Sequence, residues 1–143
     1  MASLGEKLKV NLLHLQGGII MGCCNNAVEK NKRILYSCSG ACDLGQISDL
    51  LGRKLRTNGY AQASCSCLAS IGAGIQAYID KAKAAEEVVC IDGCAVACAS
   101  KMIEKIQVRP KIYTLTKMGL PNGKIETSAT LINDLYNQIT NDK

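Results

Sequence analysis

The apolar positions between residues 33 and 59 change from a short continuous run to a helical repeat. Residues 34–36 form the apolar run, and small residues at 37–42 follow it. The apolar positions then recur every three or four residues, at Leu44, Ile47, Leu51 and Leu55. Such spacing places side chains on one face of a helix, and Asn58-Gly59 is typical of a helix end. The segment therefore predicts a strand, a turn and a helix.

The same order of elements is predicted twice more. A short strand near residues 61–64 precedes a helix whose apolar side chains share one side, at Ile71, Ile75, Tyr78, Ile79 and Ala82. A run of β-branched residues at 88–91 then predicts another strand. The helix after it has four positions that can face a core, at Ala99, Met102, Ile103 and Ile106.

The C-terminal part of the chain predicts one more strand and one more helix. The stretch "RPKIYTLTKMGLPNG", residues 109–123, supplies a fourth strand and a turn. The stretch "TSATLINDLYNQI" predicts a closing helix, with Thr127 or Ser128 as its N-cap.

Strands that alternate with helices at this spacing predict an α/β fold. We expect three layers: a parallel sheet of about four strands with helices on both faces. Residues 33–143 form this single domain, and residues 1–32 form an N-terminal extension. Leu4, Leu8, Leu12 and Leu15 suit a helix there, but "VNLLHLQGGII" suits a hairpin equally well.

The composition is that of a soluble globular domain, because 48% of the 143 residues are hydrophobic and 20% are charged. The chain has no Trp or Phe, so it lacks the stacking platforms of single-strand nucleic-acid binders. The net charge of +5 is mild, and the one tight basic cluster, "EKNKR", is interpreted as a solvated face. A nucleic-acid partner is not favoured.

No export signal or membrane span is predicted. The N-terminal residues lack an uninterrupted apolar core with a cleavage site, and no segment reaches the roughly 20 apolar residues that cross a bilayer. We therefore expect a cytoplasmic protein without membrane contact. In a reducing cytosol its nine cysteines would be thiols, which favours metal binding or redox chemistry over a disulfide framework.

Six cysteines follow the predicted strands. In an open parallel sheet, ligands bind beyond the carboxyl ends of the strands, where loops lead into helices. The pairs that follow the first, second and third strands are Cys38 and Cys42, Cys65 and Cys67, and Cys94 and Cys98. By contrast, Cys90 falls inside a strand. The sequence thus predicts a cysteine-lined edge at the C-terminal ends of the strands.

The spacing of Cys94 and Cys98 suggests that their two thiolates bind one ion together. Residues four apart in the first turns of a helix share a face, and a helix N-terminus lowers the pKa of a thiol. Gly40 and Gly93 would let the backbone turn tightly beside these cysteines. Four sulfurs suit Zn²⁺, and the same set could hold an iron–sulfur cluster, although the chain lacks CxxC pairs.

Three stretches resemble a known family: "LYSCSGACDLGQISDLLGRKL", "CLASIGAGI" and "VCIDGCAVACASKMIE". They resemble the DGC-domain family, named for the Asp-Gly-Cys motif at 92–94, over about residues 33–120. Four cysteines are proposed to bind zinc in that family. The matching positions here, which the resemblance implies as zinc ligands, are Cys38, Cys67, Cys94 and Cys98.

The chain departs from the family pattern at Cys42 and Cys65, where smaller residues without a thiol are expected. This extra pair would enlarge the site, serve a second ion or act as redox partners. Cys23 and Cys24 in the extension could fold back over the site as a lid. Adjacent cysteines rarely chelate one ion, so a ligand role for them is not favoured.

Other candidate residues have simpler interpretations. Asp92 would cap a helix by accepting backbone amides, or it would support or bind the ion. The only histidine, His14, has no second histidine beside it to support acid–base catalysis. The stretch "GAGIQA" at 72–77 matches GxGxxA but does not directly follow a strand end, so close helix packing explains it better than nucleotide binding.

The sequence thus predicts a metal-binding protein, with zinc as the expected ion and an iron–sulfur cluster as the weaker option. Its role would be metal or sulfur handling, with transfer to a protein partner. The alternative is a thiol redox enzyme or an iron–sulfur protein that uses the same cysteines. A third interpretation is a structural ion that only joins the three loops. The pattern assigns no reaction and no oligomeric state.

Overall fold

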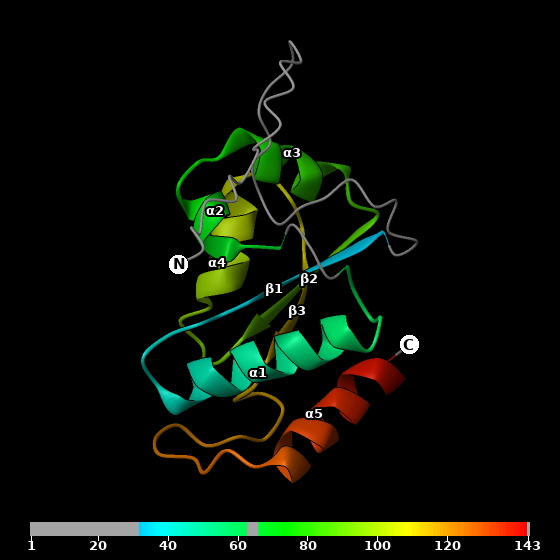
Figure 1. Ribbon diagram of the computed structural model, residues 1–143. Coiled ribbons are helices and arrows are strands. Elements are labelled where there is room, and N and C mark those ends of the chain that lie inside the picture. The colour runs from blue at the N-terminus through cyan, green and yellow to red at the C-terminus, as the bar shows by residue number, and fades with distance from the viewer. Residues whose placement is uncertain (1–31, 63–65, 143) are drawn as a thin grey trace, which may run out of the picture.

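The computed structural model describes residues 32–62 and 66–142. Figure 1 shows its strands and helices in the order β1 (Arg33–Ser37), α1 (Asp43–Thr57), α2 (Leu68–Gly72), α3 (Gln76–Ala84), β2 (Glu87–Asp92), α4 (Cys98–Lys105), β3 (Lys111–Thr114) and α5 (Ala129–Asn141). The predictions for the N-terminal extension, His14, Cys23, Cys24 and Cys65 lie outside the described residues.

The three strands form a parallel sheet in the order β1-β2-β3, which confirms the α/β fold. The central strand β2 places Val89 opposite Leu35 of β1 and Ile91 opposite Tyr113 of β3.

The prediction of four strands is wrong for residues 32–62 and 66–142, because the sheet that they form has three. Ala61 and Gln62 lie outside any strand, although the Gln62 N–H donates to the Arg33 carbonyl at 2.9 Å. Residues 61–64, the segment predicted as a strand, contain no β-branched residue, and Gln62 is their only large side chain. The segment therefore lacks the side chains that favour a strand.

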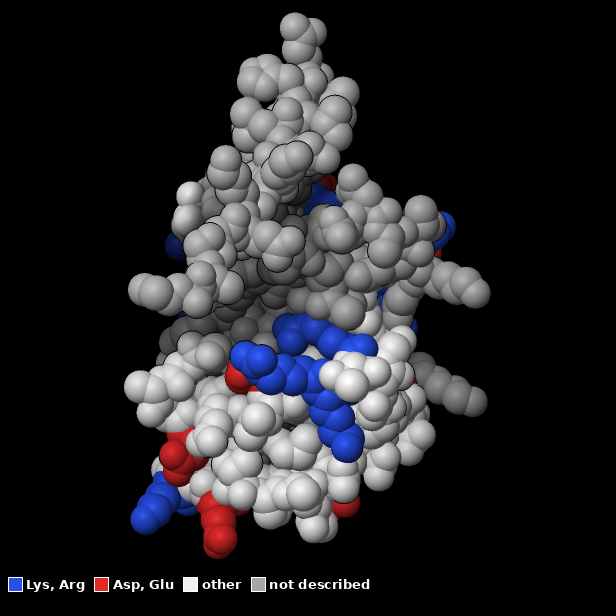
Figure 2. Space-filling view, in the orientation of Figure 1, with Lys and Arg blue, Asp and Glu red and all other residues white. Residues whose placement is uncertain are grey.

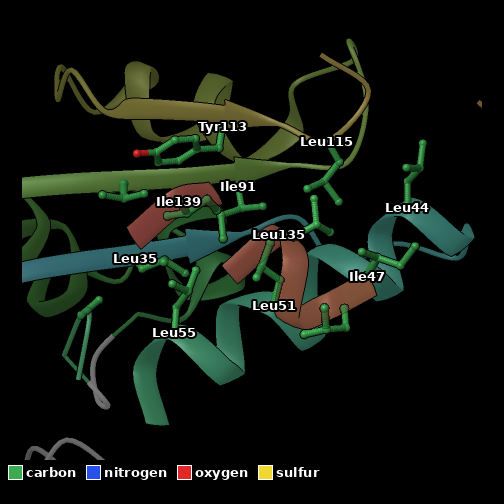
Figure 3. Packing of buried hydrophobic residues seen from close by; sticks show 13 residues of the cluster. Leu35, Leu44, Ile47, Leu51, Leu55, Ile91, Tyr113, Leu115, Leu135 and Ile139 are labelled. Carbon is green, nitrogen blue, oxygen red and sulfur yellow. The ribbon is translucent and has the colours of Figure 1, made fainter. Parts of the chain in front are cut away.

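Two apolar clusters lie on opposite faces of the sheet, because side chains alternate along each strand. The α1–α5 cluster joins those helices to one face through Leu35, Val89, Ile91 and Tyr113, as Figure 3 shows in part. The α2–α4 cluster covers the other face, with strand residues Ile34, Tyr36, Val88 and Cys90. The predicted three layers, with helices on both faces, are therefore observed.

The first and last helices match their sequence patterns. All four apolar positions predicted to face the core from α1 are buried, at Leu44, Ile47, Leu51 and Leu55. Asn58 caps the C-terminus of α1, and Gly59 follows at φ +75°, where glycine is favoured. Of the two residues predicted to cap α5, Ser128 does so, since its hydroxyl accepts the Leu131 N–H at 3.1 Å.

The single helix predicted to run from Ile71 to Ala82 is split between α2 and α3, so the prediction of one helix is wrong. Gly74 lies between them at φ +72°, and Ile75, predicted to face the core, is 45% exposed. Gly72 ends α2 where a Cβ would lie 3.1 Å from the Met102 sulfur, so it permits close packing against α4. Gly72 ends a helix and Gly74 follows it, whereas the glycines of a dinucleotide-binding loop directly follow a strand.

Basic side chains lie over the region of α1 on the face that Figure 2 shows. This helix carries Arg53, Lys54 and Arg56. Arg53 pairs with Asp49 at 2.7 Å, Lys54 lies 5.4 Å from the centre of the Tyr136 ring, and Arg56 donates to a β1 carbonyl at 3.4 Å. These cations thus make contacts within the domain itself. No helix within residues 32–62 and 66–142 is long and apolar enough to cross a membrane.

Candidate functional site

The strands β1 and β2 end side by side, and two of the predicted ligands follow them. Ser37 pairs with Ile91 in the parallel register. Cys38 extends the pairing, since its N–H donates to the Ile91 carbonyl at 2.8 Å. Cys94 comes two residues after β2. In Figure 1 these strand ends and the beginnings of α1 and α4 lie on the same side of the molecule.

The loop that joins β1 to α1 folds against the first turn of the helix. A Cβ at Gly45 would lie 2.6 Å from the Gly40 nitrogen, so only glycine fits at position 45. Cys42 is the N-cap of α1, and its carbonyl accepts the N–H groups of Gly45 and Gln46 at 2.9 and 3.1 Å. Its side chain makes no capping hydrogen bond and is exposed.

Gly93 is required for close approach rather than for a special backbone conformation. Neither Gly40 nor Gly93 has a positive φ, so neither uses the left-handed backbone conformation that glycine favours. A Cβ at Gly93 would lie 2.9 Å from the carbonyl oxygen and 3.0 Å from the Cβ of Leu44. The Asp-Gly-Cys motif thus brings the end of β2 against the first turn of α1.

Asp92 fixes the beginning of α4. Its side chain is fully buried, and its two carboxylate oxygens accept the N–H groups of Ala99 at 2.8 Å and Ser100 at 3.3 Å. The predicted role as an acceptor of helix amides is confirmed. The N-cap position itself is held by Ala97, which has a left-handed conformation with φ 58° and ψ 49°.

Cys94 and Cys98 do not share a helix face, so this part of the prediction is wrong. Helix α4 begins at Cys98, and Cys94 lies in the preceding turn, where its carbonyl accepts the Ala97 N–H at 3.1 Å. The reason is the Asp92 carboxylate, because it takes the first free amides of α4 and so sets the helix start. As a result Cys98 is exposed and Cys94 is half-buried.

The predicted ligands are divided between the two faces of the sheet. Cys38 packs against the α2–α4 cluster, whereas Cys94 packs against the α1–α5 cluster. Cys67 is exposed at the N-cap of α2, the helix that contacts α4 through Gly72. The C-terminal ends of β1 and β2 therefore separate Cys94, on the α1–α5 side, from Cys38 on the α2–α4 side.

The surroundings of Cys38 raise the pKa of its thiol. Burial is the main cause, although a hydrogen bond from the Gly93 N–H opposes it. The nearby groups Cys98, Asp92 and Cys42 raise this pKa further through charge repulsion. Cys38 thus has two other cysteines, Cys98 and Cys42, as electrostatic neighbours.

Cys67 has the opposite environment. The pKa of its thiol is lowered, first by the Ser70 hydroxyl and then by the Ser70 backbone N–H, with a smaller effect of the Ala69 N–H. Ser70 was not identified from the sequence. It lies three residues after the N-cap Cys67, a position whose backbone N–H and side chain can both contact the N-cap residue. Cys90, predicted to lie inside a strand, is fully buried in β2, and burial raises its pKa strongly.

The thiols suit a soft or borderline metal ion by their chemistry, because thiolate sulfur is a preferred ligand of zinc. Within residues 32–62 and 66–142, no three Cys, His, Asp or Glu side chains lie close enough to hold an ion. Three of the thiols, those of Cys42, Cys67 and Cys98, are exposed, so their side chains have room to rotate. The donor types thus fit zinc, and binding of one ion by several of them would require these side chains to move together.

The chain was compared with known proteins. The DGC domain matches residues 34–139. One relative is the anaerobic and virulence modulator AnvM of Pseudomonas aeruginosa, which is 27% identical over 88 residues. That match covers 61% of this chain and 66% of AnvM, slightly less than two thirds of the relative. No solved structure matches the chain. Because the DGC domain accounts for most of its length, this chain belongs to the DGC-domain family.

Proposed function

We propose that this protein is a cytoplasmic metal-binding protein that takes zinc at the ends of β1 and β2 and hands it to a protein partner. The ligands are the four cysteines that match the family pattern, Cys38, Cys67, Cys94 and Cys98. The observation that carries this proposal is the position of Cys38, half-buried at a strand end with Cys98 and Cys42 as neighbours. Unrelated structural cysteines would not gather at one loop cluster.

Residues of the chain prepare the thiols for an ion. When bound, zinc would join four thiolates in a tetrahedral arrangement. The Gly93 N–H donates to the Cys38 sulfur and favours its thiolate, while Ser70 does the same for Cys67. Asp92 orients the start of α4, on which Cys98 is the first residue. Asp92 therefore positions a ligand and is not a ligand itself.

The exposure of Cys67 and Cys98 supports transfer rather than permanent storage. A structural zinc site is closed, and its ligands are generally buried with the ion. Here the two thiols face solvent, so an acceptor could reach them. We expect a chelator to remove the ion without unfolding the domain, whereas a purely structural ion would be lost only with the fold.

Elemental analysis of the full chain, purified without oxygen, tests the proposal. We expect about one zinc per chain, lost in the Cys94→Ser, Cys98→Ser double variant and retained in Lys101→Gln, an exposed change on the same helix. Cobalt titration then counts thiolates through the sulfur-to-metal absorption. Iron with visible absorption would indicate an iron–sulfur cluster instead. Absence of metal from every preparation, with no cobalt binding, would refute a metal function.

A second candidate function, thiol redox chemistry, is favoured by the lowered pKa of Cys67. Its thiolate would attack one sulfur of a disulfide substrate, forming a mixed disulfide and releasing one substrate thiolate. Cys42 or Cys65 would then attack the Cys67 sulfur, closing a protein disulfide as the second substrate thiolate leaves. Reduction of about one oxidised glutathione per chain by metal-free, reduced wild type, with formation of a protein disulfide and no reaction in Cys67→Ser, would favour this function over metal binding.

A further inference from the structure

The dipeptide Asn-Gly occurs twice in the chain, at Asn58-Gly59 and Asn122-Gly123. In such a pair the backbone nitrogen of glycine can attack the side-chain carbonyl carbon of asparagine, because glycine has no Cβ to block the approach. The new bond closes a succinimide ring, and the side-chain amide leaves as ammonia together with the glycine N–H proton. Water then opens the ring to aspartate or isoaspartate. The reaction needs no enzyme, but it needs a glycine N–H that can lose its proton.

The two pairs have more than their sequence in common. All four residues are exposed. Both glycines have a positive φ, +75° at Gly59 and +122° at Gly123. A Cβ at either glycine would meet no atom of the described residues within 4 Å, so neither pair is crowded. Exposure and crowding therefore do not distinguish one pair from the other.

Hydrogen bonds do distinguish them, because the first pair closes the C-terminus of α1. Asn58 is the C-cap, and its N–H donates to the Lys54 carbonyl at 3.0 Å. The Gly59 N–H donates to the Arg56 carbonyl, also at 3.0 Å. A backbone N–H held in this way loses its proton only when the bond opens. The attacking nitrogen of the first pair is therefore occupied by the helix cap.

The second pair lies in the loop that leads from β3 to α5, which Figure 1 shows. The loop is held on either side of the pair: the Leu120 N–H donates to the Leu115 carbonyl at 3.1 Å, and the Ile125 N–H donates to the Asp43 carboxylate at 2.8 Å. Between these two contacts, residues 121–124 make no hydrogen bond within the described part of the chain. The nitrogen of Gly123 is therefore available for attack.

We propose that Asn122 is a deamidation site of the folded protein, at which the chain gains a carboxylate as aspartate or isoaspartate, whereas the cap of α1 protects Asn58. The conversion lowers the formal net charge by one, from +5 to +4. It leaves the core in place, because Asn122 and Gly123 are exposed. Isoaspartate also lengthens the backbone, since the chain then runs through the side-chain carbon. This site is independent of the proposed zinc function.

Mass spectrometry of the full chain, kept reduced in mildly alkaline buffer and sampled over time, tests the proposal. Trypsin cleaves after Lys and Arg, so Asn58 and Asn122 fall in different peptides and are measured separately. We expect Asn122 to deamidate at least about fivefold faster than Asn58, the factor that corresponds to one ordinary backbone hydrogen bond. Isoaspartate methyltransferase with a labelled methyl donor detects the isoaspartyl product. The Asn122→Gln variant should lose most of that signal.

The same chain unfolded in urea is the matched control. Unfolding breaks the cap of α1, so the rates at Asn58 and Asn122 should then approach each other. Equal rates at the two sites in the folded protein would overturn the proposal, as would an Asn122 that stays intact there. A ratio that persisted unchanged in urea would overturn it too, because neighbouring residues in the sequence, rather than the helix cap, would then set the selectivity.

Discussion

Replacing Asp92 with alanine should remove the contact that sets the beginning of α4. The carboxylate is fully buried and accepts two backbone amides, those of Ala99 and Ser100. Both of these residues are buried as well, so water does not readily replace the lost acceptor. Two N–H groups would therefore be left without a partner inside the protein, which is one of the more costly single changes in a small domain.

The expected loss follows from the two distances. A hydrogen bond to a charged group contributes roughly 1.5–3 kcal/mol to stability, and the bond of 2.8 Å to Ala99 is near the best length. The bond of 3.3 Å to Ser100 is long and should contribute less. We expect the Asp92→Ala variant to lose about 3 kcal/mol of unfolding free energy. Asp92→Asn keeps one oxygen for Ala99, so its loss should be about half as large.

Urea unfolding followed by circular dichroism would measure these losses. The full chain is kept with a reductant and a chelator, so that bound metal does not contribute to stability. Asp134→Ala, an exposed change on α5, is the control and should stay within about 0.5 kcal/mol of the wild type. If Asp92→Ala also stayed within that limit, the carboxylate would not be holding α4, and the argument that it positions Cys98 would fail.

The remaining predictions concern packing and thiol reactivity. Gly93→Ala should cost about 1–3 kcal/mol in the same unfolding assay, because its Cβ would overlap the backbone of α1, whereas Gly40→Ala meets no atom and should cost far less. In metal-free protein Cys67 should be alkylated faster than Cys38 near neutral pH. Its lowered pKa gives more thiolate there, so its rate should rise at a lower pH than that of Cys38, whose pKa is raised. Mass spectrometry of each modified peptide would check the order, and a reversed order would contradict both environments.

The sequence predicted the elements whose signals are local. The repeat from Leu44 to Leu55 defined α1, and a serine before an apolar repeat located the start of α5, because caps and helical periodicity depend on near neighbours. The strand expected near residue 61 was wrong, since a strand also needs a partner along its length and this segment offers β1 a single hydrogen bond among the described residues.

The candidate site shows a similar division. Order along the chain predicted correctly that Cys38 and Cys94 follow parallel strands, and the structure adds that these two strands are neighbours in the sheet. It did not predict that they pack on opposite faces, because this depends on how the backbone leaves each strand. The shared helix face of Cys94 and Cys98 was also wrong, since a carboxylate several residues earlier decides where α4 begins. Such a contact between a strand end and the helix that follows leaves no periodic signal in the sequence.

The division of Cys38 and Cys94 between the two faces has a consequence for the growing chain. The packing around Cys38 comes from segments that end by Val108, whereas the cluster beside Cys94 includes residues of α5, the last helix. During synthesis the first thiol can thus reach its final surroundings before the second. If all four thiols hold the ion, as proposed, firm capture waits until α5 has emerged and docked. Chains that end before α5 would then bind zinc weakly, and full-length chains would compete successfully for the ion.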